Sequence, residues 1–218
     1  MTLLYLVRHG ETDWNRARRI QGSTDIPLNA AGRAQAATTG SLLARRQWDG
    51  IYSSPLSRAF ETASIISGET QLGVPQTIDA IVERNYGTAE GMTGFEIDRM
   101  FPPGTEVPGR ESRDEVADRV LPALLKLADE HPDQSLIVVS HGGVIRSILA
   151  TVDPESSREQ IRNGSIHSFR HDDGELTLIA FDDPIELESL DCAEDDLGVQ
   201  NAIEGREAQG RESAGVSR

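Results

Sequence analysis

LVRHGETDWN, residues 6–15, is the stretch that decides the fold of this chain. It begins within an apolar run, and residues 2–7 predict a buried β-strand because they are β-branched, leucine or aromatic without a charge. Gly10 ends the run, and the carboxyl end of such a strand opens onto the ligand crevice of an α/β fold. Arg8 and His9 are therefore expected at the mouth of a pocket. An imidazole can act as a nucleophile, and a guanidinium pairs bidentately with phosphate oxygens. An isolated Arg-His-Gly more often only ends a strand.

A second predicted strand ends in the same way. Residues 136–140 (LIVVS) form a compact apolar run, and His141-Gly142-Gly143 precedes a stretch, residues 144–151, that is typical of a helix. If the two strands are parallel neighbours, His9 and His141 meet at one edge of the sheet. Two histidines in matching positions are hard to explain by packing alone, which favours a functional site.

Strand-like and helix-like segments alternate through the first 181 residues. Alternation of this kind predicts one α/β domain, a three-layer α/β/α sandwich around a mainly parallel sheet. Asn29 is expected to cap a helix over residues 30–47, and Pro55 to occupy the first position of the next helix. Further elements are predicted as strands at 51–53, 166–170 and 175–181, and as a helix from the capping box Ser112-x-x-Glu115 to residue 130.

The charge of the chain is unevenly distributed. The net charge at pH 7 is −15, of which residues 182–218 contribute −8 and the remainder −7. The negative net charge of residues 1–181 argues against nucleic acid as a partner, because nucleic-acid binding needs a basic surface. A site for an anionic phosphate must therefore be a local group of cations. The candidate cations are Arg8, Arg16, Arg18, Arg19, Arg58 and Arg84.

The composition changes after the predicted domain, residues 1–183. Residues 184–218 are acidic, then rich in Gly, Glu, Ala, Ser and Gln, and are predicted to be a disordered tail without catalytic function. No stretch approaches the ~20 apolar residues of a membrane span, and the run before Arg8 lacks the basic lead of a signal peptide. The single cysteine, Cys192, cannot form a disulfide within the chain. We expect a cytoplasmic protein with no membrane partner; the oligomeric state stays open, with a homodimer among the options.

Five blocks of sequence, in order, resemble the histidine phosphatase superfamily, also called the phosphoglycerate mutase-like family. They extend from about residue 3 to about residue 181, and five ordered blocks are far more specific than any one motif. The resemblance implies a phosphoglycerate mutase-like α/β/α fold and phosphoryl transfer through a phosphohistidine, with no metal and no cofactor. The blocks are LVRHGETDWN (6–15), RRIQGSTDIPLNAAGRAQA (18–36), IYSSPLSRAFETA (51–63), ERNYGTAEGMTG (83–94) and VVSHGGVIRSIL (138–149).

The resemblance assigns roles to the residues at the two strand ends. His9 is implied as the nucleophile, and Arg8, Arg58 and His141 as the groups that hold the transferring phosphoryl oxygens. Fixed cationic donors stabilise charge that is spread over three oxygens. Gly10 is expected to let the backbone approach the phosphate closely.

Glu83 is implied as the general acid, which protonates the leaving oxygen and then activates water. Relatives with an aspartate directly after the second His-Gly use that aspartate, whereas this chain has Gly143 there. The alternative for Glu83 is a surface glutamate that follows a strand.

Other residues are expected to bind the substrate or its phosphate. Asn15 and the turn Gln21-Gly22-Ser23 resemble the segment that closes over the phosphate in this family. Arg84 follows the implied acid directly and Gly142 follows the second histidine, so both are expected at the substrate. Arg19 is a further option, and a surface role for Arg16 and Arg18 is equally open.

The spacing of the blocks favours the phosphatase branch over the mutases. Mutases carry a long insertion between the acid-bearing segment and the second histidine, whereas Glu83 and His141 are only 58 positions apart. Mutases also tend to have histidine where Asn85 stands here. The expected partner is a small phosphorylated metabolite, whose identity the sequence leaves open.

Three alternatives to a histidine phosphatase remain. A cofactor-dependent phosphoglycerate mutase would isomerise its substrate instead of releasing phosphate. A metal hydrolase built on His9 and His141 would need a third ligand. A non-catalytic module that binds a phosphorylated ligand usually lacks the nucleophile or the phosphoryl clamp, and this chain keeps both.

Overall fold

The apolar run at the start of the chain forms β1 (Thr2–Arg8), an inner strand of a six-stranded sheet. The computed structural model describes residues 1–182 of the 218; the predicted tail and Cys192 lie outside the described residues. The strand order is β3-β2-β4-β1-β5-β6, parallel from β3 to β1 and antiparallel beyond it. The predicted, mainly parallel sheet is thus confirmed. The other strands are β2 (Gly50–Ser53), β3 (Gln76–Thr77), β4 (Ser135–Ser140), β5 (Ile166–Asp172) and β6 (Glu175–Ala180).

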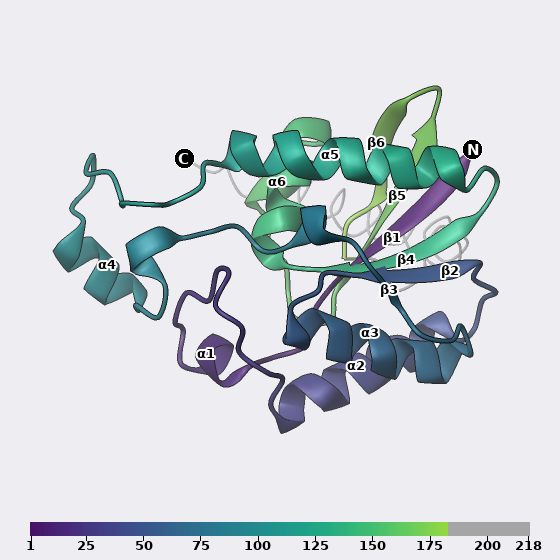
Figure 1. Cartoon of the computed structure of the whole chain (residues 1–218), viewed down its shortest axis with the longest axis horizontal. Helices are drawn as coiled ribbons and strands as arrows, with labels where there is room; N and C mark the ends of the chain where they lie inside the picture. Colours follow the sequence, from purple (N-terminus) through teal and green to yellow (C-terminus); the bar gives the residue numbers. More distant parts are fainter. Residues whose placement is uncertain (183–218) are drawn as a thin grey trace, which may run out of the picture. The chain divides into compact units, whose positions relative to one another are not determined.

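Helices cover both faces of this sheet. In Figure 1, α5 (Arg113–Glu130) and α6 (Gly142–Val152) lie on one side of it, and α2 (Ala30–Leu43) and α3 (Ser57–Thr70) on the other. The predicted α/β/α architecture is therefore confirmed. Among residues 1–182, no helix combines the length and the apolar character needed to cross a bilayer.

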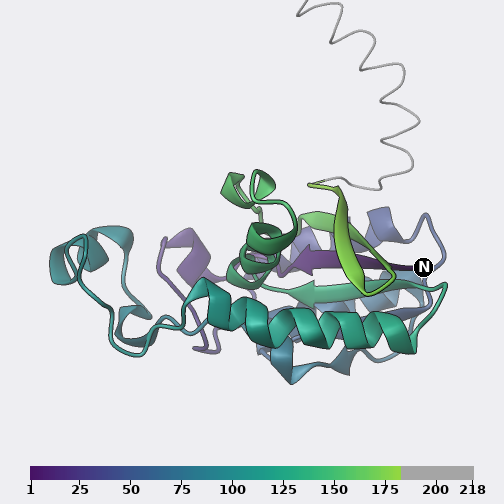
Figure 2. The same cartoon turned by 90° about the horizontal axis from the view of Figure 1, so that it is seen from above.

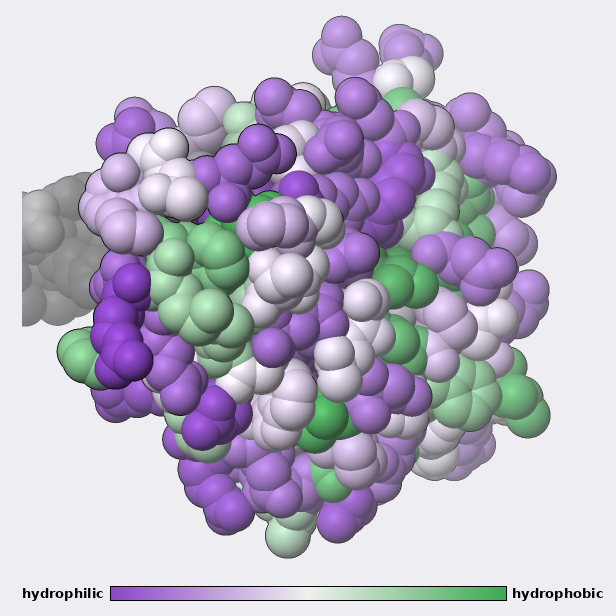
Figure 3. Space-filling model, turned by 60° about the vertical axis from the view of Figure 1, so that its left-hand side comes forward, coloured by the Kyte–Doolittle hydropathy of each residue, from purple (hydrophilic) through white to green (hydrophobic). Residues whose placement is uncertain are grey.

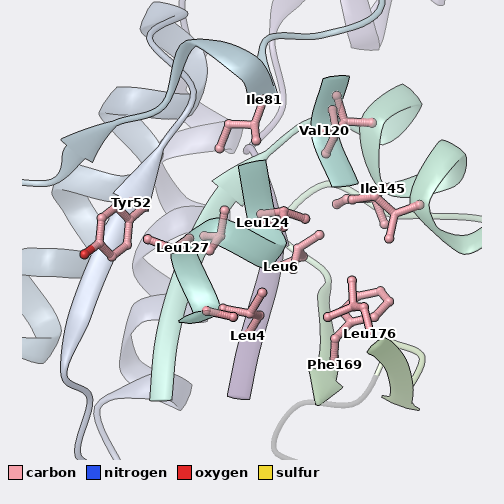
Figure 4. Close-up of a cluster of buried hydrophobic side chains, with 14 of the residues drawn as sticks. Leu4, Leu6, Tyr52, Ile81, Val120, Leu124, Leu127, Ile145, Phe169 and Leu176 are labelled. Carbon is pink, nitrogen blue, oxygen red and sulfur yellow. The ribbon is translucent and has the colours of Figure 1, made fainter. Parts of the chain in front are cut away.

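The alternation of side chains along β1 produces two separate cores. Leu4 and Leu6 point to one face and pack with α5 and α6, as Figure 4 shows. Tyr5 and Val7 point to the other face and pack with α2 and α3. Successive residues of a strand face opposite sides, so a run that is apolar at every position is suited to a sheet covered on both faces.

The carboxyl ends of β1 and β4 point toward one end of the domain, where two short helices lie (Figures 1 and 2). These helices are α1 (Asp13–Arg16) and α4 (Gly94–Met100), and neither was predicted from the sequence. Both begin with capping boxes, at Thr12 and Thr93, which satisfy the free amides of a helix too short to be stable alone. Three 3₁₀ turns complete the described elements: Asp79–Ile81, Gly87–Ala89 and Ser156–Arg158.

Two predicted helix boundaries were wrong. The helix capped by Asn29 ends at Leu43 rather than residue 47, and the indole of Trp48 donates to the Leu43 carbonyl at 2.6 Å, which satisfies that helix end. The next helix begins at Ser57, so Pro55 lies before it and not at its first position. The cap and end of α5 were predicted correctly, because a capping box is a local pattern.

Candidate active site

The two histidines predicted to meet lie next to each other at the carboxyl edge of the sheet. β1 and β4 are parallel neighbours, with Arg8 opposite Ser140, so His9 and His141 follow at matching positions. Their ring centroids are 5.1 Å apart, which confirms the predicted pairing. Both rings are buried, and His9 lines a pocket of 330 Å³ whose wall also includes Gly142, next to His141.

The environment of His9 leaves one ring nitrogen available for attack. Its Nδ1 lies 2.7 Å from the carbonyl oxygen of Gly10, and a carbonyl only accepts, so we assign the proton to Nδ1. Nε2 then carries the free lone pair. Burial, followed by repulsion from Arg8 and Arg58, holds the pKa of His9 well below its ordinary value of 6.5. His9 is therefore neutral at pH 7, as a nucleophile must be.

Unpaired hydrogen-bonding atoms surround this nucleophile. Arg8 Nε, Arg58 Nε and His141 Nδ1 are buried and have no hydrogen-bond partner within the described residues. A buried donor without a partner costs roughly 1–3 kcal/mol, and folded proteins rarely leave several together. Three such atoms beside a neutral imidazole form an arrangement suited to an anion with several oxygens.

Each of these groups is fixed by its remaining atoms. The guanidinium of Arg8 donates to the Ile161 carbonyl at 2.7 Å. Ser54 Oγ accepts from the Leu56 amide and lies 2.8 Å from His141 Nε2, so we assign the Ser54 hydroxyl as the donor to Nε2 and the ring proton to Nδ1. Burial, followed by repulsion from Arg58 and His9, holds the pKa of His141 well below 6.5.

Arg58 is fully buried near the start of α3. Its two terminal nitrogens donate to the carbonyls of Thr24 and Gly22, at 2.8 and 2.7 Å. This burial excludes the role of a helix arginine exposed to solvent. The loop of residues 21–24 therefore holds Arg58 in place.

Two side-chain amides line the pocket with their acceptor oxygens already used. Gln21 Oε1 accepts from the Thr12 hydroxyl at 2.9 Å, and Asn15 Oδ1 accepts from the Thr12 amide at 3.1 Å. Asn163 also donates to Asn15, and it holds the His9 carbonyl at 2.9 Å. The amide NH₂ groups of Gln21 and Asn15 are thus left for an anion in the pocket.

Glu83 also lines the pocket. Its carboxylate accepts from the amides of Arg84 and Gly143, at 2.7 and 3.1 Å. A Cβ atom at position 143 would lie 2.5 Å from Glu83 Oε1, so the carboxylate occupies the space that a side chain there would fill. Burial raises the pKa of Glu83 above its ordinary value of 4.5, although the two amides and Arg58 oppose the shift. A carboxyl of this kind is suited to general acid catalysis.

Some residues singled out from the sequence lie elsewhere than expected. Gly10 was expected to approach phosphate, but a Cβ atom there would meet the Gly32 carbonyl at 2.2 Å, so close packing against α2 requires the glycine. Arg16 and Arg18 are exposed and do not line the pocket. Ser23 does not line it either, and binds Glu90 instead. The predicted residues that do line the pocket are Arg8, His9, Asn15, Arg19, Gln21, Gly22, Arg58, Glu83, Arg84 and Gly142.

Glu90 was missed from the sequence, although it organises the loop that holds Arg58. Its carboxylate accepts from the amides of Ser23, Thr24 and Tyr86, at 2.9 to 3.1 Å, and from two hydroxyls of the same loop. Burial alone would raise its pKa, but these hydrogen bonds hold the pKa of Glu90 below 4.5. The glutamate is therefore ionised at neutral pH.

Glu90→Gln is expected to lower kcat/KM for phosphate esters by about 10- to 100-fold, because a hydrogen bond to a charged group contributes roughly 1.5–3 kcal/mol. The new NH₂ group would face backbone amides that can only donate, which would displace the loop and Arg58. Steady-state kinetics check this, with Glu175→Gln as a matched exposed control on β6. Equal kinetics of both variants would exclude a positioning role for Glu90.

No group of three or more His, Cys, Asp or Glu side chains within residues 1–182 is arranged to hold a metal ion. The metal hydrolase alternative therefore has no third ligand among the described residues.

Comparison with known proteins places this architecture and sequence in one family. The model of the histidine phosphatase superfamily (branch 1) matches residues 4–184. The chain is 40% identical to the uncharacterized phosphatase PhoE of Bacillus subtilis, over 76% of this chain and 86% of that one. It is 33% identical to a metal-independent phosphoserine phosphatase of Arabidopsis thaliana, over 87% and 85%. A phosphoserine phosphatase mutant of Entamoeba histolytica, crystallised with phosphoserine, superposes with a TM-score of 0.74 at 30% identity, covering 86% of this chain and all of that one. Other relatives are named phosphoglycerate mutases or mutase-like proteins.

Proposed function

This chain belongs to the histidine phosphatase superfamily, and we propose that it hydrolyses small phosphomonoesters through a phosphohistidine formed on His9. It is a phosphoric monoester hydrolase like its named phosphatase relatives. The observation that carries the proposal is a set of three buried atoms around a neutral imidazole that have no hydrogen-bond partner in the part of the chain that the structure describes: Arg8 Nε, Arg58 Nε and His141 Nδ1.

In the first step, the Nε2 lone pair of His9 attacks phosphorus and a nitrogen–phosphorus bond forms. The bond from phosphorus to the ester oxygen breaks, and the leaving oxygen takes the proton of Glu83. Splitting hydrolysis into two transfers replaces one difficult step by two easier ones. The arginines and His141 stabilise the charge on the three transferring oxygens throughout.

In the second step, the Glu83 carboxylate accepts a proton from water, and the oxygen of that water attacks phosphorus. The nitrogen–phosphorus bond breaks, which returns His9 to its neutral form and releases inorganic phosphate. Glu83 is protonated again and can act in the next cycle. One carboxyl therefore serves as acid and then as base.

The proposed substrates are small, because the pocket measures 330 Å³, near the lower end of ligand-site volumes. A solved relative binds phosphoserine, which supports a phosphorylated metabolite of this size. We favour hydrolysis over isomerisation because only 58 positions separate Glu83 and His141, too few for the long mutase insertion. The lone Cys192 in the sequence supports a cytoplasmic setting for this chemistry.

The direct test is phosphate release from p-nitrophenyl phosphate by the full-length protein in excess EDTA. We expect turnover that chelation does not reduce. Isomerisation of phosphoglycerate without phosphate release would contradict the proposal and identify a mutase. Binding without either reaction would identify a non-catalytic module.

A further inference from the structure

The segment that carries Glu83 has no helix or strand to hold it. Residues 82–85 lie between the 3₁₀ turns Asp79–Ile81 and Gly87–Ala89, and none of them belongs to a regular element. A general acid must stay within hydrogen-bond reach of the oxygen that it protonates. A side chain on a loop keeps such a position only when further contacts hold its neighbours. The contacts of residues 80–85 therefore decide where the Glu83 carboxyl lies.

An ion pair between Arg119 of α5 and Glu111 lies against this segment. Arg119 Nε donates to Glu111 Oε1 at 2.7 Å and Arg119 Nη2 donates to Oε2 at 3.0 Å, so the pair is bidentate. Hydrophilic residues cover much of the face at the end of the domain where α1 and α4 lie (Figure 3). This pair is nevertheless mostly buried: 29% of the arginine side chain and 18% of the glutamate side chain are exposed, against 40% and 46% in the Arg19–Glu96 pair. A bidentate pair removed from water holds both of its side chains in fixed directions.

The pair makes hydrogen bonds on both sides of Glu83 in the sequence. On one side, Arg119 Nη1 donates to the Ala80 carbonyl at 2.6 Å. On the other side, the Asn85 amide donates to Glu111 Oε2 at 3.1 Å, and the Glu111 amide donates to the Asn85 carbonyl at 2.9 Å. Arg119 Nη2 also reaches the Glu83 carbonyl at 3.4 Å. The backbone before and after the proposed acid is thus tied to one ion pair.

Neither member of this pair lines the active-site pocket. Both line a separate cavity of 580 Å³, which also has Glu83 and Asn85 in its wall. Glu83 lines both cavities, whereas the pair lines only the second. The pair is therefore not placed to touch a phosphate ester in the active-site pocket, and acts on it through the segment that it holds. The arginines of that pocket not named from the sequence are Arg110, Arg113 and Arg146.

Stability alone does not explain a pair of this kind. Removing an ion pair from water costs free energy, and apolar side chains of similar size often stabilise a fold as well or better. The glutamate is nevertheless ionised: burial would raise the pKa of Glu111, but hydrogen bonds from Arg119 and from the Asn85 amide hold that pKa below its ordinary value of 4.5. A charged bidentate pair supplies what an apolar pair cannot, which is a set of directed hydrogen bonds to the neighbouring backbone.

We propose that Arg119 and Glu111 are positioning residues that hold the Glu83 carboxyl where it can protonate the leaving oxygen of a phosphomonoester. The pair fixes the backbone of residues 80–85, and the amide of Gly143 fixes the carboxylate itself. Neither member of the pair touches the substrate. This inference rests on the proposed function for the role of Glu83, and it adds the contacts that make that role possible.

Glu111→Gln tests the pair with almost no change of shape. Both Glu111 oxygens accept from N–H groups, so whichever way the new amide turns, its NH₂ group meets a donor and the segment is displaced. We expect kcat/KM for glycerol 2-phosphate to fall about 10-fold or more, because this alkyl ester needs the proton of Glu83. The value for p-nitrophenyl phosphate should fall less than about threefold, since nitrophenolate leaves without a proton. A residue that only stabilised the fold would not change the ratio of the two values.

Arg119→Lys keeps the positive charge but lacks the planar fork, so it cannot make the bidentate pair and the hydrogen bond to Ala80 together. It should show the same selective loss for the alkyl ester. Glu130→Gln is the matched control, because it removes a carboxylate from an ion pair with Lys126 at the end of α5, where the two side chains are 59% and 75% exposed. Its kinetics should equal those of the wild type with both esters.

A second measurement follows the Glu83 carboxyl directly. In full-length protein labelled with ¹³C at the glutamate carboxyl carbons, the NMR signal missing from Glu83→Gln identifies this group. Burial raises the pKa of Glu83, so a displaced segment that admits water should lower the pH at which the signal titrates in Glu111→Gln. The charged and titratable groups that act on Glu83, namely Arg8, Arg58 and Tyr86, are unchanged in this variant.

Two results would overturn the positioning role alone, provided that Glu83→Gln shows the selective loss. They are an unchanged kcat/KM ratio in Glu111→Gln and wild-type kinetics in Arg119→Lys. Failure of both variants to fold, judged by thermal unfolding, would also overturn it, because the pair would then serve the fold itself. If the wild type hydrolyses neither ester, the proposed function fails and the titration decides: a lowered value in Glu111→Gln supports the positioning of this carboxyl, and an unchanged value overturns it.

Discussion

Replacement of His9 by alanine is expected to reduce phosphate release roughly 10⁴-fold or more, the scale on which enzymes lose activity when a nucleophile is removed. Among residues 1–182, no neighbouring imidazole is placed to replace it. The nearest imidazole, His141, is 5.1 Å away between ring centroids and is held by Ser54. Binding should survive because Arg8 and Arg58 remain in place.

The measurement is release of phosphate in excess EDTA, together with rapid quenching of ³²P-labelled substrate. The wild type should yield labelled protein, and His9→Ala should not. His131→Ala removes a histidine near the amino end of β4, at the opposite end of the strand from His141, and is a matched control. A His9→Ala protein that keeps a tenth of the activity, or still becomes labelled, would show that another residue is the nucleophile.

Glu83→Gln is expected to lower kcat/KM by about 10²- to 10⁴-fold for an alkyl ester such as glycerol 2-phosphate, the usual contribution of a general acid. The effect on kcat/KM for p-nitrophenyl phosphate should be below tenfold, because nitrophenolate leaves without a proton. Loss of the base in the second step should still lower kcat for both esters. Steady-state kinetics with the two substrates measure these ratios, and Glu175→Gln is the control.

The pH dependence follows from the directions of two pKa shifts. His9 must be neutral, and its lowered pKa places the acidic limb of kcat/KM well below pH 6.5. Glu83 must be protonated, and burial raises its pKa above 4.5, so activity on the alkyl ester should fall as pH rises through that raised value. The Glu83→Gln variant should lack this descending limb.

Gly143→Ala is a second test of Glu83 as the general acid, because the new Cβ would lie 2.5 Å from Glu83 Oε1 and displace the carboxylate. Like Glu83→Gln, Gly143→Ala should lower kcat/KM more for the alkyl ester than for p-nitrophenyl phosphate. An equal loss of kcat/KM for both esters in Glu83→Gln would exclude Glu83 as the acid.

Local patterns in the sequence were enough to predict the strands and helix ends that depend on residues close together in the chain. The apolar run before Arg8 and the matching run before His141 predicted two buried strands, and the capping box at Ser112 predicted where α5 begins. These predictions hold because hydrophobic periodicity and helix capping act over a few residues. The first turn of α3 was predicted wrongly at Pro55. The helix begins at Ser57, whose amide and hydroxyl donate to Asp25, a residue 32 positions earlier in the chain.

The pocket arginines show where local patterns fail. Arg110 lies just before a predicted helix, and Arg113 and Arg146 lie within predicted helices, where a helix pattern gives no sign of a pocket. Glu90 sits inside one of the five blocks but carries no local sign of its five hydrogen bonds. Their positions depend on loops held together by contacts between residues far apart in the chain.

The sequence by itself determined the α/β/α fold, placed His9 and His141 at the ends of two predicted strands, and singled out the candidate reactive side chains. That these two strands are parallel neighbours was decided by the tertiary structure. The tertiary structure also decided the chemical state of these side chains. His9 is neutral with Nε2 free, Glu83 holds its proton more tightly, and Arg8 Nε, Arg58 Nε and His141 Nδ1 have no hydrogen-bond partner among residues 1–182. The tertiary structure further decided which arginines share the pocket. The physical reason is that burial, repulsion and hydrogen-bond partners depend on distances in space, which residue order does not specify.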